Sequence, residues 1–404
     1  MIRIMKKILV FSWFYPPVNS SEAVVTFKLL NNSKYCYDVF SQNGNDSWSY
    51  GKDELLKNNK NVNTIYSSST DLKGWVDEAV NYYVENRDKY DLVMTRSMPP
   101  ESHVVGLKIK KINPYVKWIA SFGDPISNNP YEDIRLLNYK KSKLKRLLLK
   151  CRIKYLKLKN SNLEKKIFKE SDLLIFNSEY QKNFMLKDDC NYLILPHSYD
   201  EKLFKSINNK VINKKINISY FGGLDNTRNI HLLLEVLKDI KKELSNLEDK
   251  IEIKLYGSIG SNDREYILEN KLDDIVKIES AVGYLVSLRK MQEADYLLFV
   301  DANLSPIINS NIFFAAKLAD YLGSGKPIIG ITMLDGISAD ILRTTGNLVL
   351  TYSKSDIRNY LLKIINCEYK MSTNLEEMKK YNSKCVSATF DKKLGEVIKG
   401  EFGK

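Results

Sequence analysis

The segment 220–229, YFGGLDNTRN, carries side chains that could bind a phosphorylated ligand. Gly222 and Gly223 follow an apolar run, and Arg228 stands just before a helical pattern. Paired glycines let a backbone approach a ligand closely, and a helix start offers unpaired N–H groups to an anion. A guanidinium adds a planar fork that suits a diphosphate. The segment therefore predicts a diphosphate-binding loop, with an exposed arginine beside a tight turn as the alternative.

A second segment, 317–327, reads KLADYLGSGKP and places Lys317 one helical turn before Asp320. Its GSGK ending resembles part of a phosphate-binding P-loop. A P-loop requires Ser or Thr after the lysine and follows a strand, whereas Pro327 follows Lys326 here and the run precedes a strand pattern. The P-loop is therefore excluded. A carboxylate such as Asp320 is suited to two vicinal hydroxyls because it offers two acceptor oxygens.

Two loops in the first half also carry candidate polar groups. Asp124 follows a predicted strand in ASFGDPISNNPY, where it could orient or deprotonate an acceptor hydroxyl, or bind a sugar. An Asp-Pro turn is the alternative. The loop PPVNSSEA follows the first predicted strand, and Asn19, Ser20 and Ser21 could donate hydrogen bonds to a diphosphate. Capping of the following helix explains the same serines equally well.

The positive charge of the chain is concentrated between residues 140 and 169. This segment holds thirteen Lys or Arg and one acidic residue, Glu164, whereas the formal net charge of the whole chain is +13. Apolar residues recur in it every three or four positions, which predicts a basic amphipathic helix inserted at about 135–170. The cations expected to form a membrane patch are Lys143, Lys145, Arg146, Lys150, Arg152, Lys154 and Lys157.

Such a helix is suited to an anionic membrane surface, where lysine stems snorkel and leucines dip inward. A helix whose leucines pack on their own domain remains an open alternative. Nucleic acid is disfavoured because aromatic residues are sparse in the segment and no RNA- or DNA-binding signature accompanies it. We therefore expect an anionic membrane partner and no nucleic acid.

The order of predicted elements indicates an α/β fold. Continuous apolar strands alternate with helical patterns in both halves, which is typical of parallel sheets covered on both faces. This predicts two Rossmann-like doubly wound domains facing a central cleft, formed by 1–198 and 199–385. Residues 386–404 are expected to form a C-terminal helix that packs back on the first domain. Ligands bind such sheets at the carboxyl ends of the strands.

Composition narrows the class of protein further. Five cysteines without a CxxC pair suggest reduced thiols in a cytoplasmic protein, and no run is long enough to cross a bilayer. Of the three histidines, His103 and His197 are expected near the cleft. No histidine has a partner at metal-ligand spacing, so no metal site is predicted.

Several motifs together resemble one family. SYFGGLDNTRNIHLLLEVL and KLADYLGSGKPIIG are similar to the donor-binding half of nucleotide-sugar glycosyltransferases with the GT-B fold, family 4 in particular. FSWFYPP, SMPPESHVVGLKIKK, FGDP, FNSEYQKNF and LPHSYDEKLF follow the family in the same order. The resemblance covers most of the chain. The basic insertion is the least familiar part.

The resemblance implies roles for the donor-site residues. Arg228 would hold the donor phosphates, Lys317 would contact the donor, and Asp320 would take the place of the glutamate that binds ribose hydroxyls. Two departures stand out. Gly223 replaces the first phosphate-binding cation, and Ile312 replaces the other glutamate of the Glu-x7-Glu pattern. The loop before Ile312 offers Asn309 and Asn311 as groups that could serve the sugar.

The resemblance also implies an activity. The chain would move a sugar from a nucleotide diphosphate sugar, with a UDP-sugar favoured, to a glycan or a polyprenyl-diphosphate-linked acceptor. It would act without a metal or other cofactor, with retention of anomeric configuration, and with Asp124, Arg228 and Lys317 as catalytic residues. The basic helix suggests surface polysaccharide assembly, such as capsule or O-antigen, at the inner face of the cell membrane.

Two alternatives use the same fold. The first is a sugar-nucleotide epimerase; a phosphorylase is less favoured because no lysine stands in a recognisable pyridoxal phosphate setting. The second is a non-catalytic, membrane-docked partner protein, which the two departures at Gly223 and Ile312 favour. The identity of the nucleotide base, sugar, acceptor and linkage does not follow from the sequence.

Overall fold

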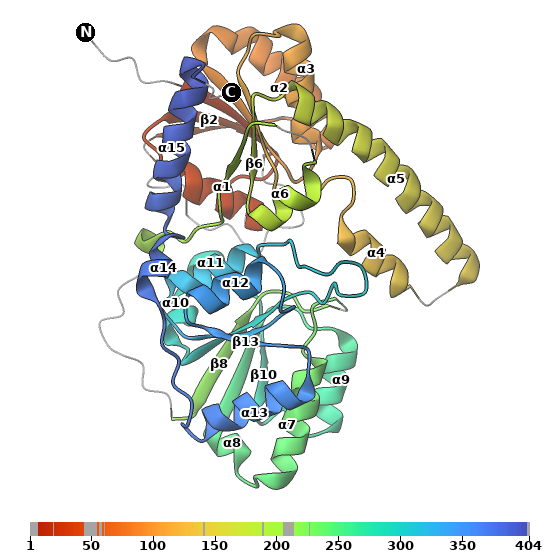
Figure 1. Cartoon of the computed structure of the whole chain (residues 1–404), viewed down its shortest axis with the longest axis vertical. Coiled ribbons are helices and arrows are strands. Elements are labelled where there is room, and N and C mark those ends of the chain that lie inside the picture. The colour runs from red at the N-terminus through yellow and green to blue at the C-terminus, as the bar shows by residue number, and fades with distance from the viewer. Residues whose placement is uncertain are drawn as a thin grey trace. The chain divides into compact units, whose positions relative to one another are not determined.

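The computed structural model describes residues 7–18, 20–43, 55, 59, 61–139, 142–187, 190–204, 214–225 and 227–401 (Figure 1). The chain divides into two compact units, Met1–Ser198 together with Asn382–Lys404, and Tyr199–Tyr381. Each unit is built on its own parallel sheet, which confirms the expected α/β class with two Rossmann-like domains. Asn19 lies outside the described residues.

The first unit contains a seven-stranded sheet in the order β3-β2-β1-β4-β5-β6-β7, with every pair parallel. Its strands are β1 (Lys7–Ser12), β2 (Cys36–Ser41), β3 (Val62–Tyr66), β4 (Leu92–Arg96), β5 (Trp118–Ser121), β6 (Leu173–Phe176) and β7 (Tyr192–Ile194). Strand order reverses between β1 and β4, so the carboxyl ends of these two strands form the switch point of this sheet.

Helices connect these strands, and most begin at a side-chain cap. Ser20 caps α1, Asp71 caps α2 and Ser178 caps α6, in each case by accepting from a backbone N–H of the first turn. The helices of the first unit are α1 (Ser21–Asn31), α2 (Leu72–Asn86), α3 (Glu101–Ile112), α4 (Pro130–Leu137), α5 (Lys143–Glu170), α6 (Glu179–Met185) and α15 (Ser383–Lys399), with a 3-10 turn η2 (Arg87–Lys89).

The two faces of the first sheet are covered by different helices. Leu9 and Phe11 point to one face, where they pack with Trp75 of α2 and Ile109 of α3. Helices α1 and α15 lie side by side although they stand at opposite ends of the sequence, as their red and blue ribbons show in Figure 1. The Ser387 hydroxyl donates to the Leu29 carbonyl at 2.7 Å across this contact. The C-terminal helix is therefore part of the first unit.

The second unit contains a six-stranded parallel sheet in the order β10-β9-β8-β11-β12-β13. Its strands are β8 (Ile216–Phe221), β9 (Ile251–Tyr256), β10 (Val276–Glu279), β11 (Tyr296–Val300), β12 (Ile328–Ile331) and β13 (Leu348–Leu350). Its helices are α7 (His231–Glu243), α8 (Leu247–Lys250), α9 (Ser261–Glu269), α10 (Tyr284–Glu293), α11 (Ala316–Gly323), α12 (Ile337–Thr344), α13 (Lys354–Ile365) and α14 (Leu375–Lys379), with a 3-10 turn η3 (Glu201–Leu203).

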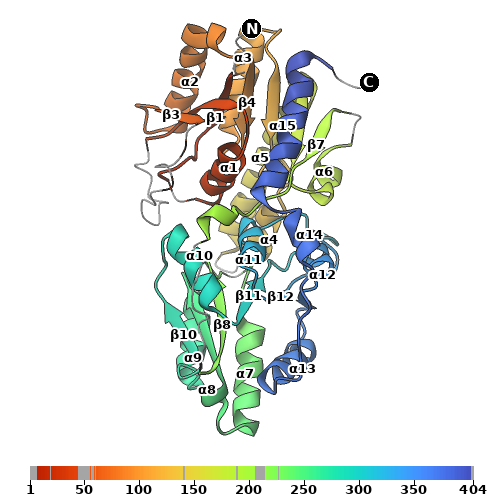
Figure 2. The ribbon, with the colours of Figure 1, turned by 90° about the vertical axis from the view of Figure 1, so that its left-hand side faces the viewer.

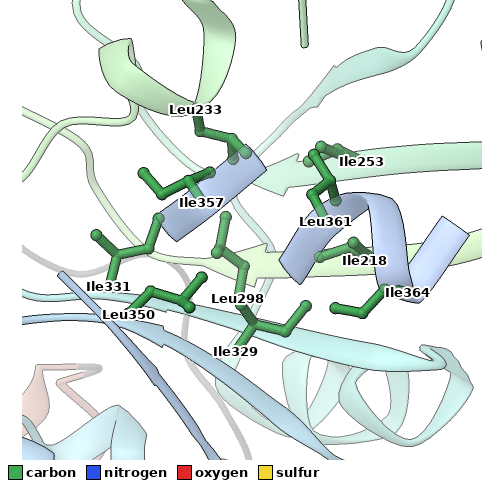
Figure 3. Close-up of a pocket in the computed structure, with 10 residues that line it drawn as sticks. All are labelled: Ile218, Leu233, Ile253, Leu298, Ile329, Ile331, Leu350, Ile357, Leu361 and Ile364. Carbon is green, nitrogen blue, oxygen red and sulfur yellow. The ribbon is translucent and has the colours of Figure 1, made fainter. Parts of the chain in front are cut away.

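The core of the second unit forms where α7 and α13, which lie side by side in Figure 2, cover the sheet. Leu233 from α7 and Leu361 from α13 meet isoleucines of the central strands there. Figure 3 shows ten Leu and Ile side chains from these elements around an apolar cavity of about 20 Å³. The cavity has room for about one water but almost no polar lining, so it is a packing defect and offers no ligand site.

Candidate functional site

The switch point of the second sheet gathers the predicted donor residues. Strand order reverses between β8 and β11, and a ligand crevice is expected at the carboxyl ends of these strands. Gly222 and Arg228 lie in the loop after β8, whereas Lys317 and Asp320 lie on α11, which follows the loop after β11. The Asn303 N–H donates to the Thr227 carbonyl at 3.2 Å and joins the two loops.

Glycines bring the loop after β8 close to its neighbours. Gly222 has φ of +124°, a conformation that favours glycine, and a Cβ there would lie 2.6 Å from Lys317 Nζ. A Cβ on Gly257 in the next loop would lie 2.3 Å from the Gly222 carbonyl oxygen. The positive φ of Gly222 and the backbone contact of Gly257 both require glycine, and they bring the loop against the Lys317 ammonium.

Tyr220 holds the Lys317 ammonium in this position. Lys317 Nζ lies 2.9 Å from the Tyr220 hydroxyl and 4.4 Å from the centre of its ring. Burial, reinforced by the positive charge of Arg228, lowers the pKa of Lys317 well below its ordinary value, while Asp301 and Asp225 oppose the shift. The positive charge of Arg228 thus disfavours the charged form of Lys317, and an anion bound by both side chains would remove this repulsion.

A tight turn positions Arg228. Asp225 Oδ1 accepts from the Thr227 and Arg228 N–H groups at 2.7 and 2.9 Å, and the Asp225 N–H donates back to the Arg228 carbonyl at 2.9 Å. Although burial acts in the opposite direction, hydrogen bonds from Thr227 and Arg228 lower the pKa of Asp225. The carboxylate therefore stays ionised and fixes the turn from which the arginine projects.

Asp301 is a buried acid of this site that the motifs did not indicate. It follows β11 directly and is 1% exposed, and burial raises its pKa against the attraction of Arg228 and Lys317. Its Oδ1 accepts from the Ala302 N–H at 2.9 Å, and the hydroxyl of the buried Ser338 lies close enough to the carboxylate to oppose the rise in its pKa. The sequence feature that could have predicted Asp301 as a site residue is its position at the carboxyl end of a central strand.

Asp320 is less accessible than the sequence suggested. It is 5% exposed, and its Oδ1 accepts from the Tyr284 hydroxyl at 2.9 Å. A ribose hydroxyl reaching this oxygen would compete with Tyr284, which projects from α10. Tyr284 is therefore a second group that the motif comparison missed.

The loop that replaces the other family glutamate is held together by Asn311. This residue is fully buried; its amide donates to the Ala302 carbonyl at 3.4 Å and accepts from the Phe313 N–H at 3.0 Å. The expectation that Asn311 serves the sugar is corrected: its side chain stabilises the loop. Ile312 is a core residue at 4% exposure, and Asn309 is exposed.

The candidate loop after β1 in the first unit resolves into a helix start. Ser20 Oγ accepts from the Ala23 N–H at 3.2 Å, so this hydroxyl caps α1. Ser21 is exposed at the first position of the helix. Glu22 follows, and its carboxylate lies 3.2 Å from the Arg96 guanidinium at the end of β4. Arg96 Nη1 also donates to Ser121 Oγ at 3.1 Å.

This ion pair borders the loop that carries Asp124. A Cβ on Gly123 would lie 2.7 Å from Glu22 Oε1. The Gly123 carbonyl accepts from the side-chain amides of Asn177 and Gln181, each at 3.0 Å. Asp124, which is half-buried, therefore follows a backbone position fixed from three sides at the carboxyl ends of the central strands.

The two histidines expected near the cleft, His103 and His197, are both buried. His103 is 0% exposed, contacts Thr95 Oγ1 through Nδ1 at 2.7 Å and packs on Phe122. His197 is 7% exposed. Burial, assisted by the charge of Arg96, lowers the pKa of each imidazole to about 3. Both rings are therefore neutral interior groups of the first unit.

The basic helix α5 presents its leucines to solvent. Leu144, Leu147 and Leu148 are 68%, 57% and 62% exposed, respectively. Ile153 and Ile167 are buried, and at about 100° per residue Ile153 faces almost opposite to Leu144. Helix α5 thus uses one face to pack on its own unit and turns the leucine face away. The alternative in which these leucines pack internally does not hold.

The predicted cations surround the exposed leucines. Lys143, Lys145, Arg146, Lys150, Arg152 and Lys154 are all exposed. Lys157 is half-buried and pairs with Asp133 of α4 at 2.6 Å. Within the described ranges no helix has the length and apolarity needed to cross a bilayer, and no cluster of three His, Cys, Asp or Glu side chains could hold a metal.

Comparisons with known proteins bear on the fold. No protein-family model matches the chain, and no curated protein is significantly similar in sequence. Among solved structures, sucrose-phosphate synthase from Thermosynechococcus elongatus superposes with a TM-score of 0.71 at 13% identity, covering 98% of this chain and 100% of that one.

Two further similar structures are the lipopolysaccharide outer core galactosyltransferase WaaB and the UDP-forming α,α-trehalose-phosphate synthase from Burkholderia xenovorans. WaaB has a TM-score of 0.60 at 13% identity, covering 98% of this chain and 100% of WaaB. The synthase has a TM-score of 0.62 at 9% identity, covering 97% and 99%. The chain therefore has the GT-B fold of nucleotide-sugar glycosyltransferases.

Proposed function

We propose that this protein is a glycosyltransferase that transfers a sugar from a nucleotide diphosphate sugar, with a UDP-sugar favoured as donor. The observation that carries the proposal is the pair of cations, Lys317 and Arg228, at the switch point of the second sheet. Phosphate groups are recognised at such strand ends by cations and by N–H groups of tight turns. The structurally similar proteins include a galactosyltransferase and a UDP-forming synthase, which supports a sugar donor.

The two cations would act most strongly on the leaving group. Breaking the bond between sugar and phosphate places additional negative charge on the departing diphosphate. Cations fixed before the reaction stabilise this charge without having to reorganise. The ammonium is held by Tyr220, and the Asp225 turn holds the backbone from which the arginine side chain extends. Arg228 and Lys317 are therefore the proposed catalytic cations, and Asp320 with Tyr284 would meet the ribose.

Acceptor activation is proposed for the first unit. Asp124 follows the fixed backbone of Gly123 and is half-buried, so its carboxylate could orient an acceptor hydroxyl. Transfer with retention would then follow a same-face route in which the leaving phosphate takes the acceptor proton. The bond to phosphate breaks, the bond to the acceptor oxygen forms, and the proton leaves with the nucleotide diphosphate.

We further propose that α5 holds the protein on an anionic membrane surface. The exposed face of Leu144, Leu147 and Leu148 and the cations beside it supply the two components of interfacial binding, apolar burial and attraction to acidic lipids. A polyprenyl-diphosphate-linked glycan would be within reach of an enzyme held in this way. We therefore propose that the protein acts in surface polysaccharide synthesis at the inner face of the cell membrane, where sugar transfer and membrane binding occur together.

Donor hydrolysis tests the transferase proposal without knowledge of the acceptor. The purified chain is incubated with UDP-, GDP- and dTDP-sugars, and released nucleotide is measured. We expect slow release from one nucleotide class, reduced at least a hundredfold in Lys317→Met and unchanged in Lys370→Met, a matched change at an exposed lysine. If no donor binds and no nucleotide is released, the transferase proposal is refuted. An epimerised nucleotide sugar recovered without release would support the epimerase instead.

A further inference from the structure

A polar pocket of about 760 Å³ lies in the second unit, beside the proposed phosphate-binding loop. It is formed by the loop after β8 with the start of α7, and by the loop after β9 with the start of α9. Because β9 is the neighbour of β8 on the side away from β11, the pocket is displaced from the switch point. Its polar lining consists of Asp225, Asn229, His231, Ser261, Asn262 and Asp263.

One wall of the pocket is fixed. His231 Nδ1 and Asp263 Oδ1 lie 3.0 Å apart, and Asp263 is 8% exposed. The Tyr266 ring packs edge-on against the imidazole with centroids 4.8 Å apart. The side chains of Asn229, Ser261 and Asn262 are exposed at the rim. The pocket therefore combines one rigid wall, which carries the Asp263 carboxylate, with amide and hydroxyl groups at the rim.

The helix starts supply donors to the same pocket. Helix α9 begins after Gly260 and α7 after Ile230, and neither of these residues caps its helix with a side chain. The first N–H groups of a helix have no intrahelical partner. At α7 the His231 N–H already donates to Asn229 Oδ1 at 3.3 Å, so the backbone donors that accompany the carboxylates of Asp225 and Asp263 come from the start of α9.

The charges in the pocket restrict the ligand. Two carboxylates repel an anion, and among the described residues they belong to no group of three His, Cys, Asp or Glu side chains that could hold a metal ion. A neutral molecule with many hydroxyl groups needs neither a counter-charge nor a full metal-ligand set, because each hydroxyl both donates and accepts. Carboxylate and amide side chains of Asp and Asn match vicinal hydroxyls, and the volume lies within the range of about 300–1,000 Å³ of small-molecule sites.

We infer that this pocket binds a neutral saccharide unit at a site separate from the nucleotide site. The inference goes beyond the proposed transfer reaction, since it requires neither a donor nor catalysis. In a transferase the site would hold a sugar residue of the glycan substrate or product away from the reacting bond.

Saturation-transfer difference NMR tests the inference with maltose, lactose and N,N′-diacetylchitobiose as probes. Asn262→Trp fills the pocket, and Glu265→Trp places the same ring at an exposed α9 position outside the lining. We expect at least one probe to bind, with affinity at least tenfold weaker in Asn262→Trp and unchanged in Glu265→Trp. Thermal unfolding of both variants checks that the fold persists.

Competition with UDP separates the pocket from the nucleotide site. Saturating UDP should leave the saccharide signal in place. Displacement by UDP would assign the sugar to the donor site and overturn the inference, as would the absence of binding by all three probes or equal binding by Asn262→Trp. Donor hydrolysis is scored independently, so failure of the saccharide site and failure of the transferase proposal are distinguishable.

Discussion

The ammonium nitrogen of Lys317 lies 2.9 Å from the hydroxyl of Tyr220 and 4.4 Å from the centre of the same ring. The aromatic face and the bare backbone of Gly222 enclose this charge, and Arg228 lowers its pKa further. An enclosed cation without a full counter-charge is poised for an anionic ligand.

Proton uptake should therefore accompany nucleotide diphosphate binding. The pKa of Lys317 is depressed in the free protein, and a bound diphosphate raises it, so the complex holds more protons at a given pH. Affinity for UDP should fall as pH rises through the depressed pKa. Calorimetry at pH 8 in two buffers of different ionisation enthalpy measures the uptake, because a terminal phosphate with a pKa near about 6 is already ionised there.

Lys317→Met provides the control for that experiment. The heats observed when UDP binds this variant should be the same in the two buffers, because no lysine takes up a proton. Buffer-independent heats in the unmodified protein, or the same proton uptake in both proteins, would show that Lys317 does not titrate on binding.

Gly222→Ala should weaken UDP binding by at least tenfold. The new Cβ would lie 2.6 Å from Lys317 Nζ and would require a φ of +124°, so we also expect a loss of about 1 kcal/mol or more in unfolding free energy. Gly260→Ala is the matched control, since a Cβ there meets no atom within 4 Å and φ is −59°. Similar UDP affinities for the two variants would contradict the close packing of the loop and Lys317.

Binding of α5 to membranes should depend on its cations. Each Lys or Arg near an acidic bilayer contributes about 1 kcal/mol, so changing Lys143, Lys145, Arg146 and Lys150 to Gln should weaken binding to phosphatidylserine vesicles at least a hundredfold. Lys165→Gln/Lys166→Gln, at exposed positions beyond the leucine face, should have a much smaller effect. Vesicle flotation gives the affinities. If both groups of variants lost vesicle affinity equally, or if neither lost any, α5 would not be the membrane-binding surface.

Acid should destabilise the first unit through His103 and His197. Their folded-state pKa is about 3 against an ordinary value of 6.5, so below pH 6.5 the unfolded chain binds protons that the folded chain does not. The free energy of unfolding should fall between pH 6.5 and 3, by up to about 1.4 kcal/mol per pH unit for each histidine.

Urea unfolding at pH 7.5, 6 and 5 measures this slope. His103→Asn and His197→Asn should each be less stable at pH 7.5 yet show a shallower decline towards pH 5. Slopes identical to that of the unmodified protein would mean that neither imidazole resists protonation in the folded state.

The sequence predicted the sheets better than the depth of individual side chains. Apolar strands alternating with helices specified both parallel sheets, and chain order placed Gly222 and Arg228 after a strand at the switch point. Asp301 could not be predicted as part of the site because a single acid after a strand forms no motif, and its electrostatic interaction with Arg228 and Lys317 joins residues far apart in the chain. The position of His103 in the sequence does not indicate that its ring is buried against Phe122 and Thr95, because these contacts form only in the fold.

Loop replacements were equally hard to predict. Asn311 looked like a polar group for a sugar, but its amide bonds the backbone of its own loop, a use that depends on the fold of that loop. The helical period of α5 was evident in the sequence. Which face of α5 packs on the unit depended on Ile153 and Ile167, whose neighbours lie far away in the chain.

Calorimetric titration of UDP, GDP and dTDP tests the central claim, nucleotide diphosphate binding by Lys317 and Arg228, most directly. The account predicts that at least one of the three binds the unmodified chain, that Lys317→Met combined with Arg228→Gln binds it at least a hundredfold more weakly, and that Lys370→Met binds it normally. Failure of all three nucleotides to bind the unmodified chain, or equal affinity in the double variant, would contradict it.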